Sequence, residues 1–250
     1  MIFKDKVVLI TGGSSGIGAA TAELFAKEGA NVAIIGRNEE RLAAVAKNCE
    51  IYSGKILAIK ADVTNDSEAK SAVQKTIDEY GKLDVLVNNA GVTRQSRILD
   101  ESFMETYDQI MNINMRAVAL LTSLAAPHLI KTKGNIVNIS SVTGRYNNLP
   151  ASSAYKVSKA ALDHFTRSTA HELAPYGVRA NAVSPGPVPT DIFNAGGLPD
   201  ASLEGLTKIT LLGKAAETSE VADIIAFLAS DRAKSVTGSN YDIDNGLLLR

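Results

Sequence analysis

Tyr155 and Lys159 stand four residues apart in a segment of helical period, so on a helix both side chains would lie on one face. A tyrosine with its ordinary pKa of about 10 exchanges protons slowly at neutral pH, and a neighbouring ammonium lowers that pKa by favouring the phenolate. The pair therefore indicates general acid–base chemistry, such as protonation of the alkoxide left when a hydride reduces a ketone. The spacing alone is weak evidence, because both residue types are common on helix surfaces.

A glycine-rich segment indicates a second kind of chemistry, the binding of a phosphate. Residues 11–18 have the sequence TGGSSGIG, between an apolar run and a stretch of helical period. Glycine lets the backbone approach a phosphate and adopt positive φ, while the free N–H groups of a following helix attract a negative ligand. A tight turn without a ligand is the alternative, but the position between a strand and a helix favours the phosphate cradle.

The elements that must position these residues are visible in the periodicity. Short runs rich in β-branched residues alternate with longer stretches of helical period. The predicted strands are 6–10, 31–35, 55–61, 83–87, 135–139, 178–183 and 239–243. The predicted helices cover roughly 16–28, 39–49, 66–79, 102–131, 153–174 and 217–229.

This alternation predicts an α/β fold, a single doubly wound domain over residues 1–250 with a seven-stranded, mostly parallel sheet and helices on both faces. Ligands of such sheets bind at the carboxyl ends of the strands. Residues 186–213 lack a clear period and hold three prolines and the pair Gly196-Gly197. A segment of this length indicates a substrate loop or lid.

The composition excludes several functional classes. The 250 residues carry 26 Lys+Arg against 27 Asp+Glu, so no global attraction for nucleic acid or for an anionic membrane is expected. The single cysteine, Cys49, cannot form an internal disulfide, and the three histidines are scattered, so no metal site is expected. The apolar run 7–10 is too short for a signal sequence or a spanning helix. We expect a cytoplasmic protein.

The glycine spacing TGxxxGxG resembles that of the short-chain dehydrogenase/reductase family rather than the common GxGxxG fingerprint. Three further segments match this family in the same order over nearly the whole chain. They are Asn88-Asn89-Ala90-Gly91 after the fourth predicted strand, Tyr155 with Lys159 on a helix, and Pro185-Gly186 after the sixth strand. The resemblance implies a Rossmann-type domain and an enzyme that interconverts a carbonyl compound and an alcohol by hydride transfer with NAD(P).

The resemblance also implies a catalytic set. Tyr155 would be the general acid or base, and Lys159 would tune it and hold the cofactor ribose. A serine after the fifth strand would hold the substrate oxygen; Ser141 fits the family pattern, with Ser140 as the fallback. The second of two asparagines in the next helix upstream, Asn114, would support a water in the proton relay, although it could merely bond a backbone carbonyl.

The choice of cofactor depends on the residue after the second strand. NAD-preferring members of the family carry an acidic residue there, whereas this chain has Gly36 and Arg37. A guanidinium can bind the 2′-phosphate, so NADP(H) is predicted as the preferred cofactor, with NAD(H) possible. The alternative is a surface arginine paired with Glu39 or Glu40.

The other expected cofactor contacts lie in the matching segments. Asp62-Val63 resembles the pair that contacts adenine, but a helix N-cap or an Asx turn explains Asp62 equally well. Thr190 matches the threonine that meets the nicotinamide carboxamide. The full expected set is Gly12, Ser14, Ser15, Gly16, Ile17, Gly18, Arg37, Asp62, Val63, Asn89, Ala90, Gly91, Tyr155, Lys159, Pro185, Gly186, Val188 and Thr190.

The substrate is predicted from the loop and from segment 145–149, both expected to border the pocket. The apolar loop residues favour an apolar ketone or secondary alcohol, such as a steroid, terpenoid or xenobiotic carbonyl. A 3-oxoacyl thioester is the alternative, although no compact basic patch for an acidic carrier protein stands out among Arg94, Arg97 and Arg116. The loop residues in question are Ile192, Phe193, Leu198, Leu203, Leu206, Leu211 and Leu212.

Small residues such as Ala117 and Ala160 would permit close helix packing in a homotetramer or homodimer, and core packing explains many of them equally well. Two rival functions remain. A nucleotide-binding scaffold protein is disfavoured because all four catalytic residues are present, and an epimerase or lyase because 250 residues leave no room for a longer substrate domain.

Overall fold

The computed structural model describes residues 1–146, 152–197 and 200–250. The strands are β1 (Val7–Thr11), β2 (Asn31–Gly36), β3 (Ile56–Lys60), β4 (Val85–Asn88), β5 (Asn135–Ile139), β6 (Arg179–Pro185) and β7 (Asn240–Ile243). The helices are α1 (Gly16–Lys27), α2 (Glu39–Cys49), α3 (Asp66–Tyr80), α4 (Phe103–Met111), α5 (Ala117–Thr132), α6 (Ser153–Leu173), α7 (Ile192–Ala195), α8 (Asp200–Lys208) and α9 (Thr218–Ala229).

The described strands form one sheet in the order β3-β2-β1-β4-β5-β6-β7, and every neighbouring pair is parallel. The predicted doubly wound α/β architecture is confirmed. The chain order reverses between β1 and β4, and a crevice for ligands is expected outside the carboxyl ends of these two strands.

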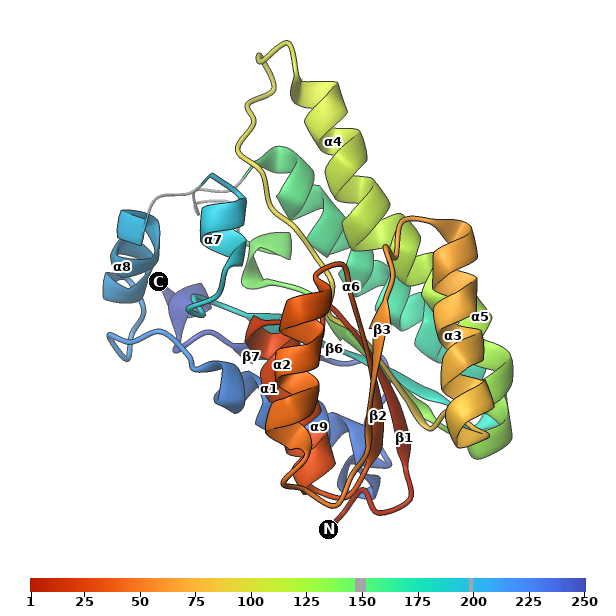
Figure 1. Cartoon of the computed structure of the whole chain (residues 1–250). Helices are drawn as coiled ribbons and strands as arrows, with labels where there is room; N and C mark the ends of the chain where they lie inside the picture. The colour runs from red at the N-terminus through yellow and green to blue at the C-terminus, as the bar shows by residue number, and fades with distance from the viewer. Residues whose placement is uncertain (147–151, 198–199) are drawn as a thin grey trace.

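The sheet is buried on both faces because its strands are apolar at successive positions. Along β1, Val8 and Ile10 pack with α1 and α9, while Val7 and Leu9 pack with α3 and α5. In Figure 1, α3 and α5 lie to the right of the strands, and α1, α2 and α9 lie to their left. The carboxyl ends of the strands are therefore the part of the sheet left open to a ligand.

The predicted helix 102–131 forms without a break, but one of its turns is wider than an α-helical turn. A π-helical turn, η1 (Asn112–Arg116), joins α4 to α5. By length and composition the helix Phe103–Thr132 could cross a membrane, a test that the core helices of soluble proteins also pass. Its face around Leu121, Ala125 and Leu129 is buried in the core against the sheet.

The expectation that 186–213 has no regular structure was wrong. Two short helices, α7 and α8, form there and lie beside the carboxyl edge of the sheet (Figure 1). Each has less than three turns, and Gly196, Gly197 and Pro199 separate them in the sequence, so neither leaves an apolar period long enough to reveal it.

Buried amides join the central strands to α6. Asn88 Nδ2 donates to Asn138 Oδ1 at 2.9 Å, and Asn138 Nδ2 donates to Thr166 Oγ1 at 2.9 Å. Asn88 and Asn138 are fully enclosed, and Asn88 Nδ2 also lies 3.3 Å from Thr122 Oγ1. This chain of bonds fixes the ends of β4 and β5 against the helix that carries Tyr155 and Lys159.

Replacing Asn138 with leucine should lower the free energy of unfolding by about 1–3 kcal/mol, because buried groups of Asn88 and Thr166 lose their partner. Urea denaturation measures the change. Asn48→Leu, at an exposed position on α2, is the matched control and should have little effect. Equal stabilities of the two variants would contradict a structural role for the amide chain.

Candidate active site

A cavity of about 460 Å³ lies along the carboxyl ends of β1, β2, β4, β5 and β6. It is lined by the glycine-rich segment at one end and by Ser141, Tyr155 and α7 at the other. Of the eighteen residues expected to contact a cofactor, all but Gly18 line this cavity. The structure thus brings together segments that are far apart in the sequence.

The glycine-rich segment has the geometry of a phosphate cradle. Gly12 and Gly16 have φ angles of 64° and 54°, which L side chains rarely adopt. Ser15 precedes α1 without a side-chain bond to it, so the first N–H groups of this helix stay available for a ligand. Gly18 does not reach the cavity, but its Cβ would collide with the Gly12 carbonyl oxygen, so it lets α1 approach the loop closely.

A second set of bonds holds the loop after β4 to the loop after β1. The amides of Asn89 and Ala90 both donate to Thr11 Oγ1 at 2.9 Å, and Asn89 Nδ2 donates to the carbonyls of Thr11 and Gly12 at 2.9 and 3.2 Å. Asn88 was also expected to line the crevice, and this was wrong, because its amide points into the sheet toward Asn138.

Arg37 is exposed and lines the cavity just beyond the carboxyl end of β2, where the adenosine of a cofactor was expected. Glu39 pairs with Lys60 instead of Arg37, at 3.2 Å, and Arg37 has no ion pair among the described residues. Its charge acts on Asp62. Burial opposes ionisation of Asp62, but the hydrogen bonds from Thr64 and the charge of Arg37 outweigh it and hold the pKa below its usual value.

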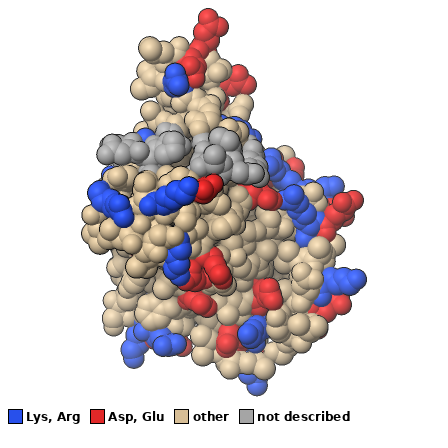
Figure 2. Space-filling model, turned by 90° about the vertical axis from the view of Figure 1, so that its left-hand side faces the viewer, with Lys and Arg blue, Asp and Glu red and all other residues tan. Residues whose placement is uncertain are grey.

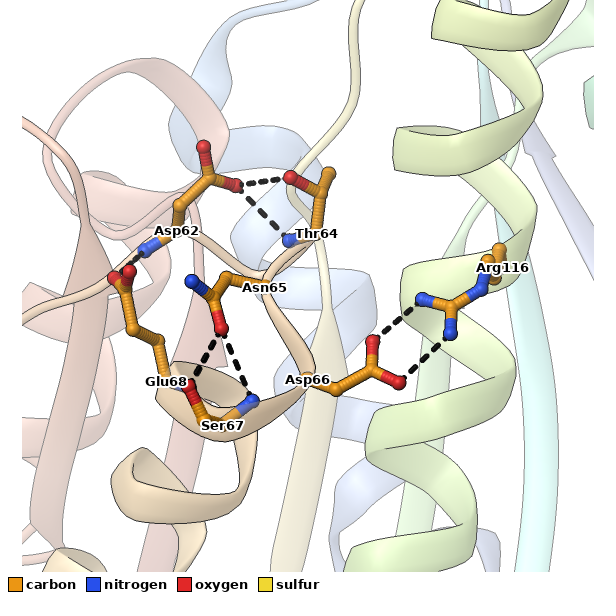
Figure 3. Close-up of polar contacts among 7 residues, drawn as sticks. All are labelled: Asp62, Thr64, Asn65, Asp66, Ser67, Glu68 and Arg116. Atoms are coloured by element: carbon orange, nitrogen blue, oxygen red, sulfur yellow. Dashed lines mark hydrogen bonds and ion pairs between the residues drawn. The ribbon is translucent and has the colours of Figure 1, made fainter.

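Asp62 was expected either to form a local turn or helix cap or to contact a ligand. Asp62 Oδ1 accepts from Thr64 N at 2.9 Å and Thr64 Oγ1 at 2.7 Å, which is an Asx turn, and Asp62 also lines the cavity. Helix α3 is capped by Asn65 instead, whose Oδ1 accepts from the amides of Ser67 and Glu68 (Figure 3). A turn and a ligand contact are therefore compatible at Asp62.

Figure 3 also shows Arg116 of η1 reaching Asp66 at the start of α3. Both guanidinium nitrogens donate to the carboxylate, at 2.6 and 2.8 Å, and this bond lowers the pKa of Asp66. Arg116 is therefore engaged within the chain rather than free for a carrier protein.

Tyr155 is buried on the first turn of α6, which Ser152 caps by accepting from the Tyr155 amide. Burial raises the pKa of Tyr155 to about 12, and a hydrogen bond with the Ser141 side chain opposes the rise. Ser141 Oγ also accepts from Thr143 in the short 3₁₀ turn η2 (Val142–Gly144). Ser140 directs its hydroxyl to the Lys159 carbonyl at 3.2 Å, so the geometry favours Ser141 over Ser140 as the partner of Tyr155.

The expectation that Lys159 leaves Tyr155 with a lowered pKa was wrong. Lys159 Nζ lies 5.7 Å from the centre of the Tyr155 ring and donates to the Ile139 carbonyl at 2.8 Å. Burial lowers the pKa of Lys159 itself to about 8, against the charge of Asp163. Burial of the phenol therefore decides the sign of the shift, and the charge of Lys159 is not among the groups that change the pKa of Tyr155.

Asn114 is fully buried in η1 and does not line the cavity. Its amide donates to the Val92 carbonyl and to Ser158 Oγ, at 2.9 and 3.0 Å, and accepts from the Val92 amide at 2.8 Å. The alternative of a bond to a backbone carbonyl is thus realised. A Cβ on Gly91 would meet Asn114 Oδ1 and Lys159 Nζ at 3.4 and 3.5 Å, so both polar groups flank the same point of the cavity wall.

Comparisons with known proteins agree with this geometry. A family model described as enoyl-(acyl carrier protein) reductase matches residues 12–248. A 3-oxoacyl-[acyl-carrier-protein] reductase FabG of Thermotoga maritima is 40% identical over 250 residues, which is 100% of both chains. The chain belongs to the short-chain dehydrogenase/reductase family. It is accordingly an oxidoreductase that acts on CH–OH groups with a nicotinamide cofactor.

Two other members of the short-chain dehydrogenase/reductase family are similar over nearly the whole chain. A cyclopentanol dehydrogenase of Comamonas is 39% identical over 245 residues, 97% of this chain and 96% of that protein. A short chain dehydrogenase from Burkholderia cenocepacia, solved in complex with NADP, is 33% identical with a TM-score of 0.92 and covers 99% of this chain and 100% of that chain.

The substrate end of this dehydrogenase/reductase cavity is mostly apolar. Ile192 and Phe193 of α7 and Leu206 of α8 line it, as predicted, together with Val142 and Leu247. Leu211 and Leu212 were expected there, but they are 51% and 69% exposed and do not line the cavity. Leu203 does not line it either, and Leu198 lies outside the described residues.

The expectation for segment 145–149 was wrong where the structure describes it. Arg145 pairs with Asp163 and Asp242, and Tyr146 packs on Val142 and Leu247, so neither side chain lines the cavity. Asn147, Asn148 and Leu149 lie outside the described residues.

Sequence reasoning missed Asn38 and Arg41, which line the adenosine end beside Arg37. Arg41 is held in the first turn of α2, where its amide donates to the cap Asn38 at 2.9 Å. Its guanidinium reaches Asp191 at 2.6 Å, next to Thr190 on the far side of the cleft. The four-residue spacing of Arg37 and Arg41 was a signal, but nothing local indicated the partner 150 residues away.

Proposed function

We propose that this chain is an NADP(H)-dependent oxidoreductase that interconverts an apolar ketone or aldehyde and the corresponding alcohol. The observation that supports it is one cavity that holds a buried Tyr155–Ser141 pair at one end and a glycine cradle with Arg37 at the other. The cradle, with its positive φ angles and free helix N–H groups, fits the pyrophosphate of a dinucleotide.

When bound, NADPH supplies the hydride that reduces the carbonyl carbon of the substrate. Ser141 and Tyr155 hold the carbonyl oxygen between their hydroxyl groups, and the oxygen takes the phenol proton of Tyr155 as negative charge develops on it. Tyr155, whose pKa burial raises to about 12, carries the proton that this step requires at neutral pH.

The remaining members of the proposed set support this proton transfer. The ammonium of Lys159 holds the cofactor ribose and stabilises the phenolate that Tyr155 leaves behind. Asn114 fixes the Val92 backbone and the π-helical turn beside Lys159, and through them the water that returns a proton to Tyr155.

Tyr155→Phe should lower kcat for ketone reduction by about 10²–10⁴-fold, as expected for loss of a general acid, with little change in NADPH affinity. Steady-state kinetics and NADPH fluorescence titration measure the two quantities. Tyr146→Phe is the matched control, since Tyr146 packs outside the cavity, and it should keep full activity. Undiminished turnover in Tyr155→Phe would refute the mechanism.

NADP(H) is proposed as the preferred cofactor because Arg37 lines the cavity and makes no ion pair among the described residues, so its guanidinium can meet a 2′-phosphate. The Burkholderia relative that was solved with NADP supports this choice. Binding of NAD(H) is compatible with the rest of the cavity.

Arg37→Asp should reverse the ratio of kcat/KM for NADPH over NADH by at least about tenfold, because it replaces a charge-assisted contact with repulsion. Arg232→Asp, an exposed change near the end of α9, controls for the altered net charge. If Arg37→Asp leaves the ratio where it is in the unchanged protein, the 2′-phosphate assignment fails.

An apolar ketone fits the cavity wall, and the cyclopentanol dehydrogenase among the relatives acts on a small apolar alcohol by its name. A 3-oxoacyl thioester is the second candidate, favoured by the identity of 40% to the FabG relative. Figure 2 shows both signs of charge interspersed over the face that carries α7 and α8, with no large basic patch for an acidic carrier.

A panel of substrates should separate these candidates. It contains cyclic ketones, ketosteroids and quinones, together with 3-oxoacyl thioesters of a short thiol and of an acyl carrier protein. We expect the highest kcat/KM for an apolar ketone, followed through NADPH absorbance at several substrate concentrations. A preference of more than about tenfold for the carrier-bound thioester would overturn the apolar-ketone proposal in favour of the second candidate.

We also propose a cytoplasmic homotetramer or homodimer. The surface of the α4–α5 and α6 helices supports a subunit interface, since Met104 and Val157 are 58% and 47% exposed there.

A further inference from the structure

A buried carboxylate lies one helical turn beyond Lys159 and has no part in the proposed reaction. Asp163 follows Lys159 by four residues on α6, so the two side chains share one face of the helix. They are 5% and 4% exposed. Neither carboxylate oxygen of Asp163 accepts a hydrogen bond of normal geometry from the described residues. A buried charge in this state requires an explanation.

The charges around Asp163 come from three elements. Arg145, which follows η2, brings its Nε to 3.9 Å from Asp163 Oδ2 and pairs through its other end with Asp242 on β7. On α6 itself, the charges of Lys159 and Arg167 act on Asp163. The Ser140 hydroxyl, bonded to the Lys159 carbonyl, is the neutral polar neighbour.

Asp163 and Lys159 each affect the pKa of the other. Burial raises the pKa of Asp163, while Ser140, Arg145, Arg167 and Lys159 oppose the rise. In the other direction, burial lowers the pKa of Lys159, and Asp163 is the group that opposes this. The two side chains make no direct ion pair, so the coupling acts through the low-dielectric interior between them.

We propose that Asp163 is a positioning residue that holds Lys159 in its ammonium form, with Arg145 and Asp242 fixing the carboxylate in place. Arg145 reaches both carboxylates at once, so it neutralises Asp163 only in part and leaves negative charge to act on Lys159. Without that charge, nothing would oppose the effect of burial, which favours the neutral amine. A neutral Lys159 would stabilise the Tyr155 phenolate less and hold the ribose less firmly.

This inference rests on the proposed function only for the use made of Lys159, and its first test needs neither cofactor nor substrate. Competitive acetylation across a pH series, resolved by mass spectrometry, reports the pH at which Lys159 becomes reactive. We expect a midpoint at about pH 8 in the unchanged protein, as burial lowers the pKa to that value. In Asp163→Asn, which keeps the shape and removes the charge, the midpoint should fall by about one pH unit.

Three variants make the test specific. Asp163→Glu keeps the charge and should keep the midpoint near that of the unchanged protein. Asp242→Asn removes a carboxylate from the same arginine, but one that is not among the charges acting on the pKa of Lys159, and it should shift the midpoint less than half as far. If Asp163→Asn does not fold, Asp163→Ser serves as the neutral variant. An unchanged Lys159 midpoint in a folded neutral variant would overturn the proposal.

The second readout is the pH profile of ketone reduction. The ammonium is lost as pH rises through the pKa of Lys159, so activity should fall on the alkaline side, and in Asp163→Asn this fall should begin about one unit lower. At more acidic pH, kcat should match that of the unchanged protein, whereas a general loss of structure would lower it everywhere and count against the proposal. Absence of reductase activity in the unchanged protein would refute the proposed function without affecting the acetylation result.

Discussion

The candidate site depends on one constraint, namely that the carboxyl ends of the central strands are held together by buried polar side chains rather than by apolar packing. Thr11 and Asn89 join the loops after β1 and β4, and Asn138 joins the strand ends to α6. Such groups are costly to bury unless every one finds a partner, so they permit few alternative arrangements. The cavity can stay open because these bonds hold its walls.

Burial at this edge of the sheet also sets the pKa values of Tyr155 and Lys159. Tyr155 and Lys159 are both removed from water, and each is pushed toward its neutral form, one with a raised pKa and the other with a lowered pKa. Asp163 follows Lys159 by one turn on α6, and Arg145 links it to Asp242 on β7. The surroundings of Tyr155 and Lys159, as well as the residues that touch them, therefore set the pKa values of both side chains.

Much of the architecture could be predicted from periodicity, because strands buried on both faces leave a strong apolar signal at 31–35 or 135–139. The short helices α7 and α8 left no such signal. The glycine-rich segment and Tyr155 could be predicted because the residue types that do their chemistry are close together in the sequence. The neighbours of Arg145 could not, because Asp163 and Asp242 are distant in sequence and only the packing of α6 on the sheet brings them together.

The raised pKa of Tyr155 shows the same limit. Spacing placed an ammonium near the phenol, but the sign of the shift depends on how completely both groups are enclosed, which no local pattern records.

The ion pair between Arg41 and Asp191 has a consequence for anyone who would alter substrate choice by exchanging loops. Asp191 belongs to the segment that leads into α7, while Arg41 belongs to the adenosine end of the cleft. A grafted loop that lacks this carboxylate would leave the Arg41 guanidinium without its partner. Two arginines, Arg37 and Arg41, could then attract a phosphate in the same cavity. The start of α2 and the segment that leads into α7 are therefore linked through one ion pair, and a change at either residue alters the charge of the cavity wall.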